Sequence, residues 1–424
     1  MEKNLQLNKE QNNALELALQ GTNLFVTGGA GVGKTVLVRW IVDELQRAGK
    51  EVIVCAPTGI AAIQVGGVTI HRAFQARTVP YIEGDRGRLL DTVKVADVIV
   101  IDEISMCRFD LLEYVARCIM RAEKVAKKKI QIIVAGDFYQ LPPVVQTKDE
   151  YVLCKGWPRM DMDNGYYAFA GPSWQDLHLS NIELTQIMRQ TDQEFAQYLN
   201  RIRKGDVAAI DWINEHASRN AQPGIYIYPT NRLVEQKNRA EIDKLGDPTR
   251  TYRADIINYS DKYPADEVLK ICEGARVMTL INNSQDGYQN GSLGTVCQLG
   301  NSYIKIRLDS GKTVDIERCE WDCYEYVVVD GAGDKPPHLD RRKVGSFRQY
   351  PLRVAYAVTV HKSQGQTFDS VNLDPYCFAA GQLYVALSRV RDISHLHLLR
   401  DIRPSDLIVS PEVAEFYRHR HRAA

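Results

Sequence analysis

Short runs of consecutive hydrophobic residues recur through the first part of the chain, and a polar, glycine or proline turn ends each run. The runs cover residues 24–26, 52–55, 98–101 and 130–135, with stretches of helical apolar spacing between them. Strands that are apolar on both faces are typical of a parallel sheet with helices on both sides. The pattern predicts an α/β fold in which a doubly wound sheet forms a first lobe.

A second group of such strands lies at 225–228, 354–360, 371–373 and 395–399, and it predicts a similar second lobe. Between the first two of these strands the pattern changes to short alternating stretches joined by Asn-Gly and Ser-Gly turns, which is typical of hairpins. We therefore expect an inserted antiparallel β-barrel, and a shorter glycine-rich insert in the first lobe. The expected boundaries are 1–63 and 95–187 for the first lobe, 64–94 for its insert, 188–250 and 354–424 for the second lobe, and 251–353 for the barrel.

Composition limits the class of protein but does not indicate whether the protein binds nucleic acid. The 424 residues carry 53 basic and 53 acidic side chains, so net charge neither favours nor opposes nucleic-acid binding. The nine cysteines lack the spacing of a zinc site, and we expect reduced thiols in a cytoplasmic protein. No stretch approaches the roughly 20 apolar residues that a membrane span needs, so we expect no membrane partner.

A glycine-rich loop is the first candidate for chemistry. It follows an apolar strand, opens a helix-patterned stretch and fits the pattern G-x-x-x-x-G-K-[ST]. Such loops aim backbone N–H groups at phosphate oxygens, while the lysine reaches the β/γ-phosphates and the last hydroxyl binds Mg²⁺. The sequence therefore predicts a nucleotide site formed by Gly28, Gly29, Ala30, Gly31, Val32, Gly33, Lys34 and Thr35.

Acidic and amide side chains follow the next buried strands. Asp102 and Glu103 come directly after the strand at 98–101. Asp102 would hold Mg²⁺, and Glu103 would orient and deprotonate an attacking water, so the predicted reaction is hydrolysis. Gln140, after the following strand, could sense the γ-phosphate. Arg189 and Arg389 are candidates for stabilising the charge that spreads over the transferred phosphoryl group.

Eight short motifs occur in the order of superfamily-one helicase motifs. They are 28–35, 56–59, 69–71, 102–106, 136–143, 184–190, 361–367 and 384–389. Within this superfamily the chain resembles the RecD/Dda/PIF branch, and most closely a compact bacterial or phage-type helicase of the PIF (petite integration frequency) family. The stretch 110–117 leading into 132–137 looks like the signature of that family.

The resemblance implies two RecA-like lobes of the P-loop NTPase class with ATP between them, a strand-separating wedge as the first insert and an SH3-like β-barrel as the second. It implies an ATP-dependent, Mg²⁺-requiring DNA helicase that moves 5′ to 3′ on single-stranded DNA, unwinds duplex at ss/ds junctions and acts as a monomer. Roles in DNA replication, repair, recombination or telomere-type maintenance near the nucleoid would follow, with G-quadruplexes and RNA–DNA hybrids as further candidate substrates.

The same resemblance assigns individual roles. Gln11 would contact the adenine, Gln140 the γ-phosphate, and Gly365 would belong to the nucleotide site. Arg189 and Arg389 would be arginine fingers. The residues implied to line the DNA groove or to couple it to ATP are Pro57, Thr58, Gly59, His71, Thr359, His361, Lys362, Ser363 and Gln364.

Several alternatives stay open. The spacing Asn8-x-x-Gln11 also fits a helix capping box, which competes with adenine recognition. The cluster Arg341-Arg342-Lys343 lies near aromatic residues and either meets DNA or is a solvated surface. An RNA helicase of the same superfamily, or a nucleotide-switched binding module, would share most of these motifs. ATP turnover and unwinding of DNA and RNA substrates distinguish the three.

Overall fold

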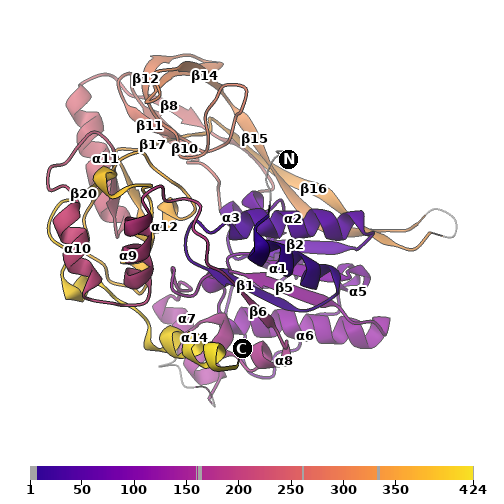
Figure 1. Ribbon diagram of the computed structural model, residues 1–424. Coiled ribbons are helices and arrows are strands. Elements are labelled where there is room, and N and C mark those ends of the chain that lie inside the picture. Colours follow the sequence, from indigo (N-terminus) through magenta and orange to yellow (C-terminus); the bar gives the residue numbers. More distant parts are fainter. Residues whose placement is uncertain (1–6, 159, 161–164, 260–261, 332–334, 424) are drawn as a thin grey trace. The chain divides into compact units, whose positions relative to one another are not determined.

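The computed structural model describes residues 7–158, 160, 165–259, 262–331 and 335–423 (Figure 1). The chain forms two compact units. The first, here lobe 1, comprises Met1–Met188, Tyr324–Lys343 and Ser410–Ala424, and the second, here lobe 2, comprises Arg189–Cys323 and Val344–Val409. Among the described residues, no helix is long and apolar enough to cross a membrane.

Lobe 1 is built on a six-stranded sheet in the order β3-β2-β4-β5-β1-β6, with every neighbouring pair parallel. The central strands are fully buried, as their continuous hydrophobic runs predict. The strands are β1 (Leu24–Gly28), β2 (Val52–Ala56), β3 (Val68–Thr69), β4 (Val98–Ile101), β5 (Gln131–Ala135) and β6 (Ser180–Leu184).

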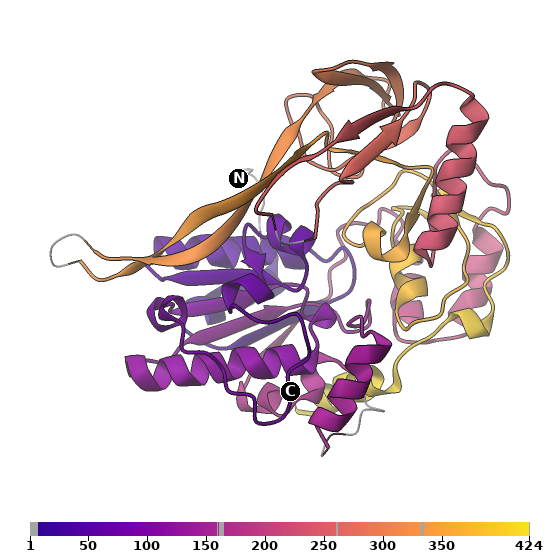
Figure 2. The same cartoon turned by 180° about the vertical axis from the view of Figure 1, so that it is seen from behind.

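Helices cover both faces of this sheet, as Figures 1 and 2 show from opposite sides. Alternate strand residues point to opposite faces. On one face, Leu24 and Val26 pack with Leu37 and Ile41. The elements of this face include α1 (Lys9–Leu19) and α2 (Lys34–Arg47). The doubly wound arrangement predicted for lobe 1 is confirmed.

The opposite face carries a larger, aromatic-rich core in which Phe25 packs with Phe138 and Trp174. The longest helix that contributes to this core is α6, and shorter helical elements complete it. The remaining helical elements of lobe 1 are α3 (Gly59–Gln64), α4 (Ile70–Ala73), α5 (Asp91–Val95), η1 (Ile104–Met106), α6 (Phe109–Ala126), α7 (Thr147–Gly156), η3 (Ala168–Ala170), α8 (Ser173–Asp176) and α14 (Pro411–Ala423).

The insert expected at 64–94 is smaller than predicted. Its first part forms β3, which pairs in parallel with Cys55 and Ala56 of β2 and so belongs to the sheet. The following loop packs on α6, where buried Tyr81 stacks on Tyr114 at 4.1 Å between ring centroids. This part of the excursion therefore covers the core. Hydrophobic pattern alone does not separate a two-residue edge strand from a loop.

Two segments also differ from the expected boundaries. Helix α14 belongs to lobe 1 rather than lobe 2, because Val413 and Tyr417 are buried in the aromatic core of lobe 1. The outer part of the hairpin formed by β15 (Cys319–Val329) and β16 (His338–Gln349) also belongs to lobe 1. There the Tyr326 hydroxyl accepts a hydrogen bond from the Val54 N–H at 2.9 Å.

Lobe 2 contains the second parallel sheet that the sequence predicts, in the order β18-β7-β19-β20. Its strands are β7 (Ile225–Tyr228), β18 (Ala357–Thr359), β19 (Val371–Leu373) and β20 (Leu396–Leu398). Its helical elements are α9 (Gln193–Arg203), α10 (Ala209–His216), α11 (Asn231–Leu245), α12 (Val360–Ser363), α13 (Gln382–Leu387), η4 (Ile393–His395) and η5 (Pro404–Asp406).

The insert of lobe 2 is β-rich, as predicted. Five antiparallel strands form one sheet in the order β14-β13-β12-β11-β17, β8 pairs with β10, and β9 joins the β15–β16 hairpin. Its closure into an SH3-like barrel stays a prediction. The strands not yet named are β8 (Arg250–Arg253), β9 (Asp255–Ile257), β10 (Val268–Ile271), β11 (Arg276–Thr279), β12 (Leu293–Leu299), β13 (Tyr303–Leu308), β14 (Thr313–Glu317) and β17 (Leu352–Val354).

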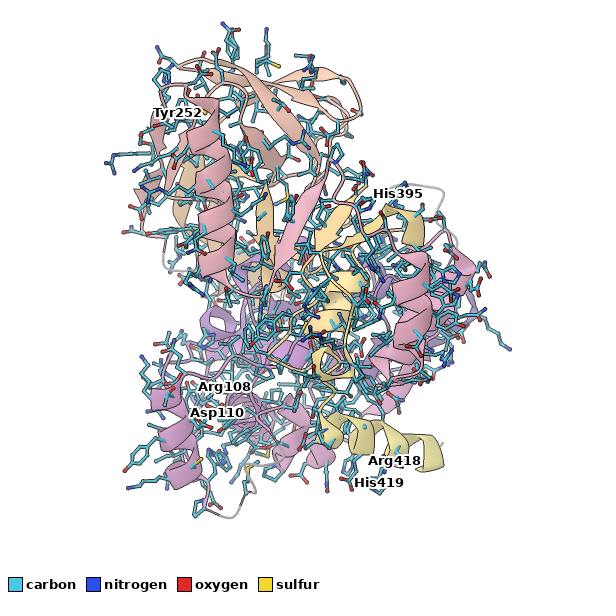
Figure 3. All side chains as sticks on the ribbon, turned by 90° about the vertical axis from the view of Figure 1, so that its left-hand side faces the viewer. Arg108, Asp110, Tyr252, His395, Arg418 and His419 are labelled. Atoms are coloured by element: carbon cyan, nitrogen blue, oxygen red, sulfur yellow. The ribbon has the colours of Figure 1, made fainter. Side chains whose placement is uncertain are left out.

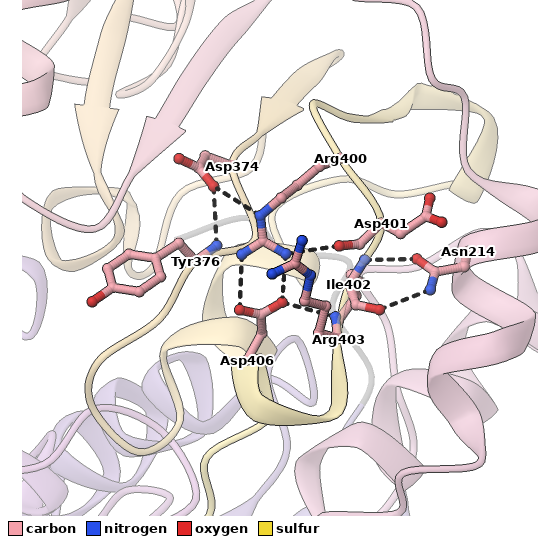
Figure 4. A network of polar contacts seen from close by, with 8 residues as sticks. All are labelled: Asn214, Asp374, Tyr376, Arg400, Asp401, Ile402, Arg403 and Asp406. Atoms are coloured by element: carbon pink, nitrogen blue, oxygen red, sulfur yellow. Dashed lines mark hydrogen bonds and ion pairs between the residues drawn. The ribbon is translucent and has the colours of Figure 1, made fainter.

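An ion-pair network fixes the chain that leaves β20 (Figure 4). Both Nη atoms of Arg400 donate to the Asp406 carboxylate, at 2.7 and 2.8 Å, and the Arg403 N–H donates to the same group. Asn214 of α10 exchanges two hydrogen bonds with the backbone of Ile402. The segment that precedes α14 is therefore anchored within lobe 2.

Candidate functional site

The phosphate loop joins β1 to α2 through glycines that no other residue could replace without strain. Gly28 has φ 142°, and a Cβ there would lie 2.3 Å from the Leu184 carbonyl oxygen. Gly33 caps α2 with φ 86°. The Lys34 ammonium donates to the carbonyls of Gly28 and Gly29 at 2.8 and 3.0 Å. The loop thus curls around its own lysine, the shape that a phosphate cradle requires.

The two predicted metal ligands lie side by side. The Thr35 hydroxyl donates to Asp102 Oδ2 at 3.2 Å, and the Glu103 N–H donates to Asp102 Oδ1 at 2.9 Å. Burial raises the pKa of Asp102, against the opposing effects of the Glu103 hydrogen bond and the Lys34 charge. A hydroxyl and a carboxylate are hard oxygen donors of the kind that Mg²⁺ prefers, so the residues fit this ion.

Glu103 occupies an unusual backbone conformation. Its φ of 52° lies in the left-handed region, which few non-glycine residues adopt, and its side chain is partly exposed. Strain of this kind is concentrated at functional sites, where surrounding structure holds it in place. Next to buried Asp102, this geometry supports distinct roles for the two neighbouring carboxylates.

Gln140 sits in a tight turn directly after β5. The turn closes on Asp137, whose carbonyl accepts from the Gln140 N–H at 2.9 Å and whose carboxylate accepts from the Gln140 side-chain amide at 3.3 Å. A Cβ at Gly136 would lie 2.9 Å from Ile104 Cγ2. The absence of a side chain at Gly136 therefore lets the turn pack directly against the segment that follows Glu103.

Gln11 serves the capping box and also reaches the phosphate loop. Its side-chain oxygen accepts from the Asn8 N–H at 3.0 Å, and its own N–H donates to the Asn8 side chain at 2.8 Å, so the capping interpretation is confirmed. Its amide nitrogen lies 3.1 Å from where a Cβ on Gly33 would be. The side chain therefore borders the predicted nucleotide site, and adenine recognition stays a prediction.

In lobe 2, Arg189 lies against the 365–388 region. Its two Nη atoms donate to the carbonyls of Ser388 and Gly365, both at 3.4 Å. These are long bonds at a partly exposed side chain. The structure thus brings together Arg189, Gly365 and the residue preceding Arg389, three positions that the sequence places far apart.

Arg389 is held much more tightly. It is only 1% exposed. Its Nε donates to the Val385 carbonyl at 2.6 Å, and Nη1 donates to the carbonyls of Ser363 and Gln366, both at 3.0 Å. Nη2 donates to the Ser388 hydroxyl at 2.6 Å. Arg389 therefore ties helix α13 to the 363–366 segment, in addition to any role in hydrolysis.

The predicted DNA-binding residues occur at equivalent points of the two lobes. Pro57, Thr58 and Gly59 follow β2, and the Thr58 side chain caps α3. Thr359 ends β18 and caps α12 by accepting from the Lys362 N–H at 3.2 Å. In both lobes a capping threonine stands at the carboxyl end of a buried parallel strand, and the backbone N–H groups of the helix that follows are of the kind that can bind phosphate.

The four remaining predicted DNA-binding residues of lobe 2, at positions 361–364, differ in how far their side chains are exposed to solvent. Burial lowers the pKa of both His361 and Lys362, with smaller contributions from neighbouring cations. Gln364 and His361 are partly exposed. Ser363 is fully buried, and its hydroxyl donates to the Val360 carbonyl at 2.8 Å. The Ser363 side chain therefore has a structural role within α12, and the role of this residue in binding DNA or in coupling DNA to ATP stays a prediction.

In lobe 1, His71 lies in the short helix α4 that follows β3, and it is partly exposed. The basic cluster at 341–343, one of the open alternatives, makes contacts within lobe 1 instead. Arg341 donates to the Gly66 carbonyl at 2.6 Å, and Arg342 pairs with Glu325. These contacts fasten the outer hairpin, which favours a structural explanation for the cluster.

Comparison with known proteins decides the family. The sequence profile of the PIF1-like helicases matches residues 6–212. The ATP-dependent DNA helicase Pif1 of Bdellovibrio bacteriovorus is 31% identical over 98% of this chain and 92% of its own length. The chain belongs to the PIF1-like helicase family. The predicted family and its two RecA-like lobes are confirmed.

Solved structures of Pif1 helicases share the fold of this chain. The crystal structure of Bacteroides sp Pif1 in complex with ADP-AlF4 is 33% identical, covers 99% of this chain and 98% of its own, and has a TM-score of 0.85. The crystal structure of Bacteroides Pif1 bound to ssDNA is 34% identical over the same shares, with a TM-score of 0.68.

The family signature of this helicase has a visible structural role in α6. Figure 3 labels Arg108 and Asp110. Asp110 is fully buried, accepts from Arg108 Nε at 2.9 Å and also accepts from the Tyr81 N–H at 2.8 Å. Glu113 accepts from the backbone and hydroxyl of Ser173 at 2.6 and 2.8 Å. These carboxylates hold the 75–90 loop and α8 against α6.

The Lys34→Ala variant should lose ATP hydrolysis while keeping its thermal stability, because it removes the charge that meets the β/γ-phosphates and leaves the buried core of lobe 1 unchanged. Glu103→Gln should bind ATP and fail to turn it over. Steady-state turnover and binding of a fluorescent ATP analogue measure both effects. Lys127→Ala, an exposed lysine just after α6, is the matched control. Near wild-type turnover by Glu103→Gln with single-stranded DNA present would rule out the general-base assignment.

Arg189→Ala and Arg389→Ala should separate catalysis from folding. Both should lower kcat by ~10³ to 10⁵, the contribution of an arginine finger in related phosphoryl-transfer enzymes. Arg389→Ala should also lower the melting temperature, because it leaves buried carbonyls unpaired at a cost of about 1–3 kcal/mol each. Thermal unfolding measured beside turnover tests the difference. Equal losses of melting temperature would contradict it.

Proposed function

We propose that this chain is an ATP-dependent, Mg²⁺-requiring DNA helicase that moves 5′ to 3′ on single-stranded DNA. The observation that carries the proposal is the single edge of the lobe 1 sheet that collects Lys34, the Thr35–Asp102 pair, Glu103 and Gln140. In open α/β sheets, ligands bind at the carboxyl ends of the strands. The family named by the comparisons supports the nucleic-acid substrate.

In this mechanism Lys34 would neutralise charge on the β/γ-phosphates, and Thr35 and Asp102 would hold a Mg²⁺ ion, whose charge would offset the charge that develops during phosphoryl transfer. Glu103 orients and deprotonates the attacking water. Gln140 would contact the γ-phosphate, and Arg189 and Arg389 would act as arginine fingers. Gln11 contacts the base.

A direct backbone connection supports coupling between hydrolysis and DNA. The Asp102 N–H donates to the Cys55 carbonyl at 3.0 Å, and Cys55 lies two residues before Pro57. The carboxylate pair and the predicted DNA-binding segment of lobe 1 are thus joined across neighbouring strands. A shift at one side of this connection acts directly on the other.

The DNA contacts proposed for lobe 2 suit a motor that ignores sequence. Thr359, His361, Lys362 and Gln364 offer a hydroxyl, a ring nitrogen, an ammonium and an amide, which are groups that bind phosphates. Burial and the charge of Lys262 lower the pKa of His361, which favours the neutral imidazole, a group that can contact DNA by hydrogen bonding. We propose that a single copy carries out these steps.

Duplexes with a single-stranded tail on either strand test the proposal. With ATP and Mg²⁺, the helicase should unwind the DNA duplex carrying a 5′ tail and leave the 3′-tailed duplex paired. Lys34→Ala should unwind neither, and rates proportional to protein concentration would support action as a monomer. Preferential unwinding of RNA-tailed substrates would favour the RNA-helicase alternative, and ATP binding without unwinding would favour a nucleotide-switched module.

A further inference from the structure

The last helix of the described chain, α14, carries two aromatic residues into the core of lobe 1. Phe416 stacks on Phe169 with ring centroids 4.2 Å apart and meets Phe138 edge-on at 5.3 Å. Tyr417 is 4% exposed. In Figure 3, the labelled residues Arg418 and His419 mark the outer part of this helix. One face of α14 is therefore fixed to lobe 1, and the other is open.

The Tyr417 hydroxyl lies between two segments of the ATP edge. It is 2.8 Å from the Thr27 hydroxyl and accepts from the Phe138 N–H at 3.2 Å. Because the oxygen accepts from Phe138, its own proton is available to Thr27. Thr27 is the residue before Gly28, where the phosphate loop begins, and Phe138 lies in the turn that carries Gln140.

The Tyr417 ring adds a second contact to the same turn. It stacks on Tyr139 with ring centroids 4.8 Å apart and an interplanar angle of 10°. Phe138 and Tyr139 are the two residues between Asp137 and Gln140, and the Gln140 amide bonds back to Asp137. Tyr417 therefore contacts both residues that set the shape of the turn.

We propose that Tyr417 is a positioning residue for ATP hydrolysis, which holds the Gln140 turn in register with the start of the phosphate loop. This inference rests on the proposed ATP site and adds to it a residue from the far end of the sequence. Tyr417 does not touch the nucleotide in this account. It acts through Phe138 and Tyr139 on Gln140, and through Thr27 on Gly28.

The rate of hydrolysis at such a site depends strongly on the positions of the groups around the reacting phosphate. A displacement of about 1 Å in a group that contacts the reacting phosphate can cost ~10²-fold in rate. A hydroxyl that bridges two catalytic segments should therefore affect kcat more than its single hydrogen bond affects stability. Binding of ATP, which depends on Lys34 and the loop backbone, should change little.

Tyr417→Phe tests the inference, with Tyr114→Phe as the matched control. Tyr114 is 3% exposed in the same core, and its hydroxyl donates to the Phe74 carbonyl at 3.1 Å, away from the ATP edge. Both variants lose one buried hydroxyl and should lose similar melting temperature. Only Tyr417→Phe should lower kcat for ATP hydrolysis at saturating single-stranded DNA, by about tenfold, with KM for ATP nearly unchanged.

Thr27→Val removes the partner hydroxyl while keeping the side-chain volume, and Thr27→Ser keeps the hydroxyl. Thr27→Val should lower kcat, Thr27→Ser should restore most of it, and the double variant with Tyr417→Phe should lose less than the sum of the two single losses. Wild-type kcat in Tyr417→Phe, or an equal loss in Tyr114→Phe, would overturn the inference. A wild-type protein without ATP turnover would instead refute the proposed function.

Discussion

The parallel alignment of the lobe 1 strands is the constraint on which the candidate site depends. Phe25, Val134, Ile101 and Cys55 lie in one hydrogen-bonded row across β1, β5, β4 and β2. Each of these strands ends within three residues of that row, so the segments that follow meet at one edge. Sheet register thereby brings together a phosphate loop, a carboxylate pair, an amide turn and the predicted DNA-binding loop after β2, which come from distant parts of the sequence.

Sequence was sufficient for the parts of this arrangement that local chemistry dictates. Gly28 and Gly33 adopt backbone conformations that favour glycine. Asp102 follows β4, whose continuous apolar run indicates a strand that is buried on both faces. The capping box of Asn8 and Gln11 joins residues three positions apart, and so the sequence predicted it as well. Such features leave a local pattern because their partners lie within a few residues.

Features that depend on distant partners could not be predicted. Tyr417 meets Thr27 across 390 positions of sequence, and nothing in its local pattern distinguishes it from a residue of an exposed terminal helix. Ser363 lies in a motif that suggested contact with DNA, yet the carbonyl of Val360 takes its hydroxyl. The role of Arg341 was ambiguous for the same reason, since its hydrogen-bond partner, the Gly66 carbonyl, lies 275 positions away in the sequence.

The central claim is that the edge of the lobe 1 sheet hydrolyses ATP in response to a bound DNA strand. Steady-state ATP turnover of the wild-type protein, measured with and without unstructured single-stranded DNA at one fixed salt concentration, tests it most directly. The account predicts a large increase in kcat when DNA is present, because the loop proposed to bind DNA follows β2, and the Cys55 carbonyl of β2 accepts a hydrogen bond from Asp102, the neighbour of Glu103. Turnover that is the same with and without DNA would contradict it.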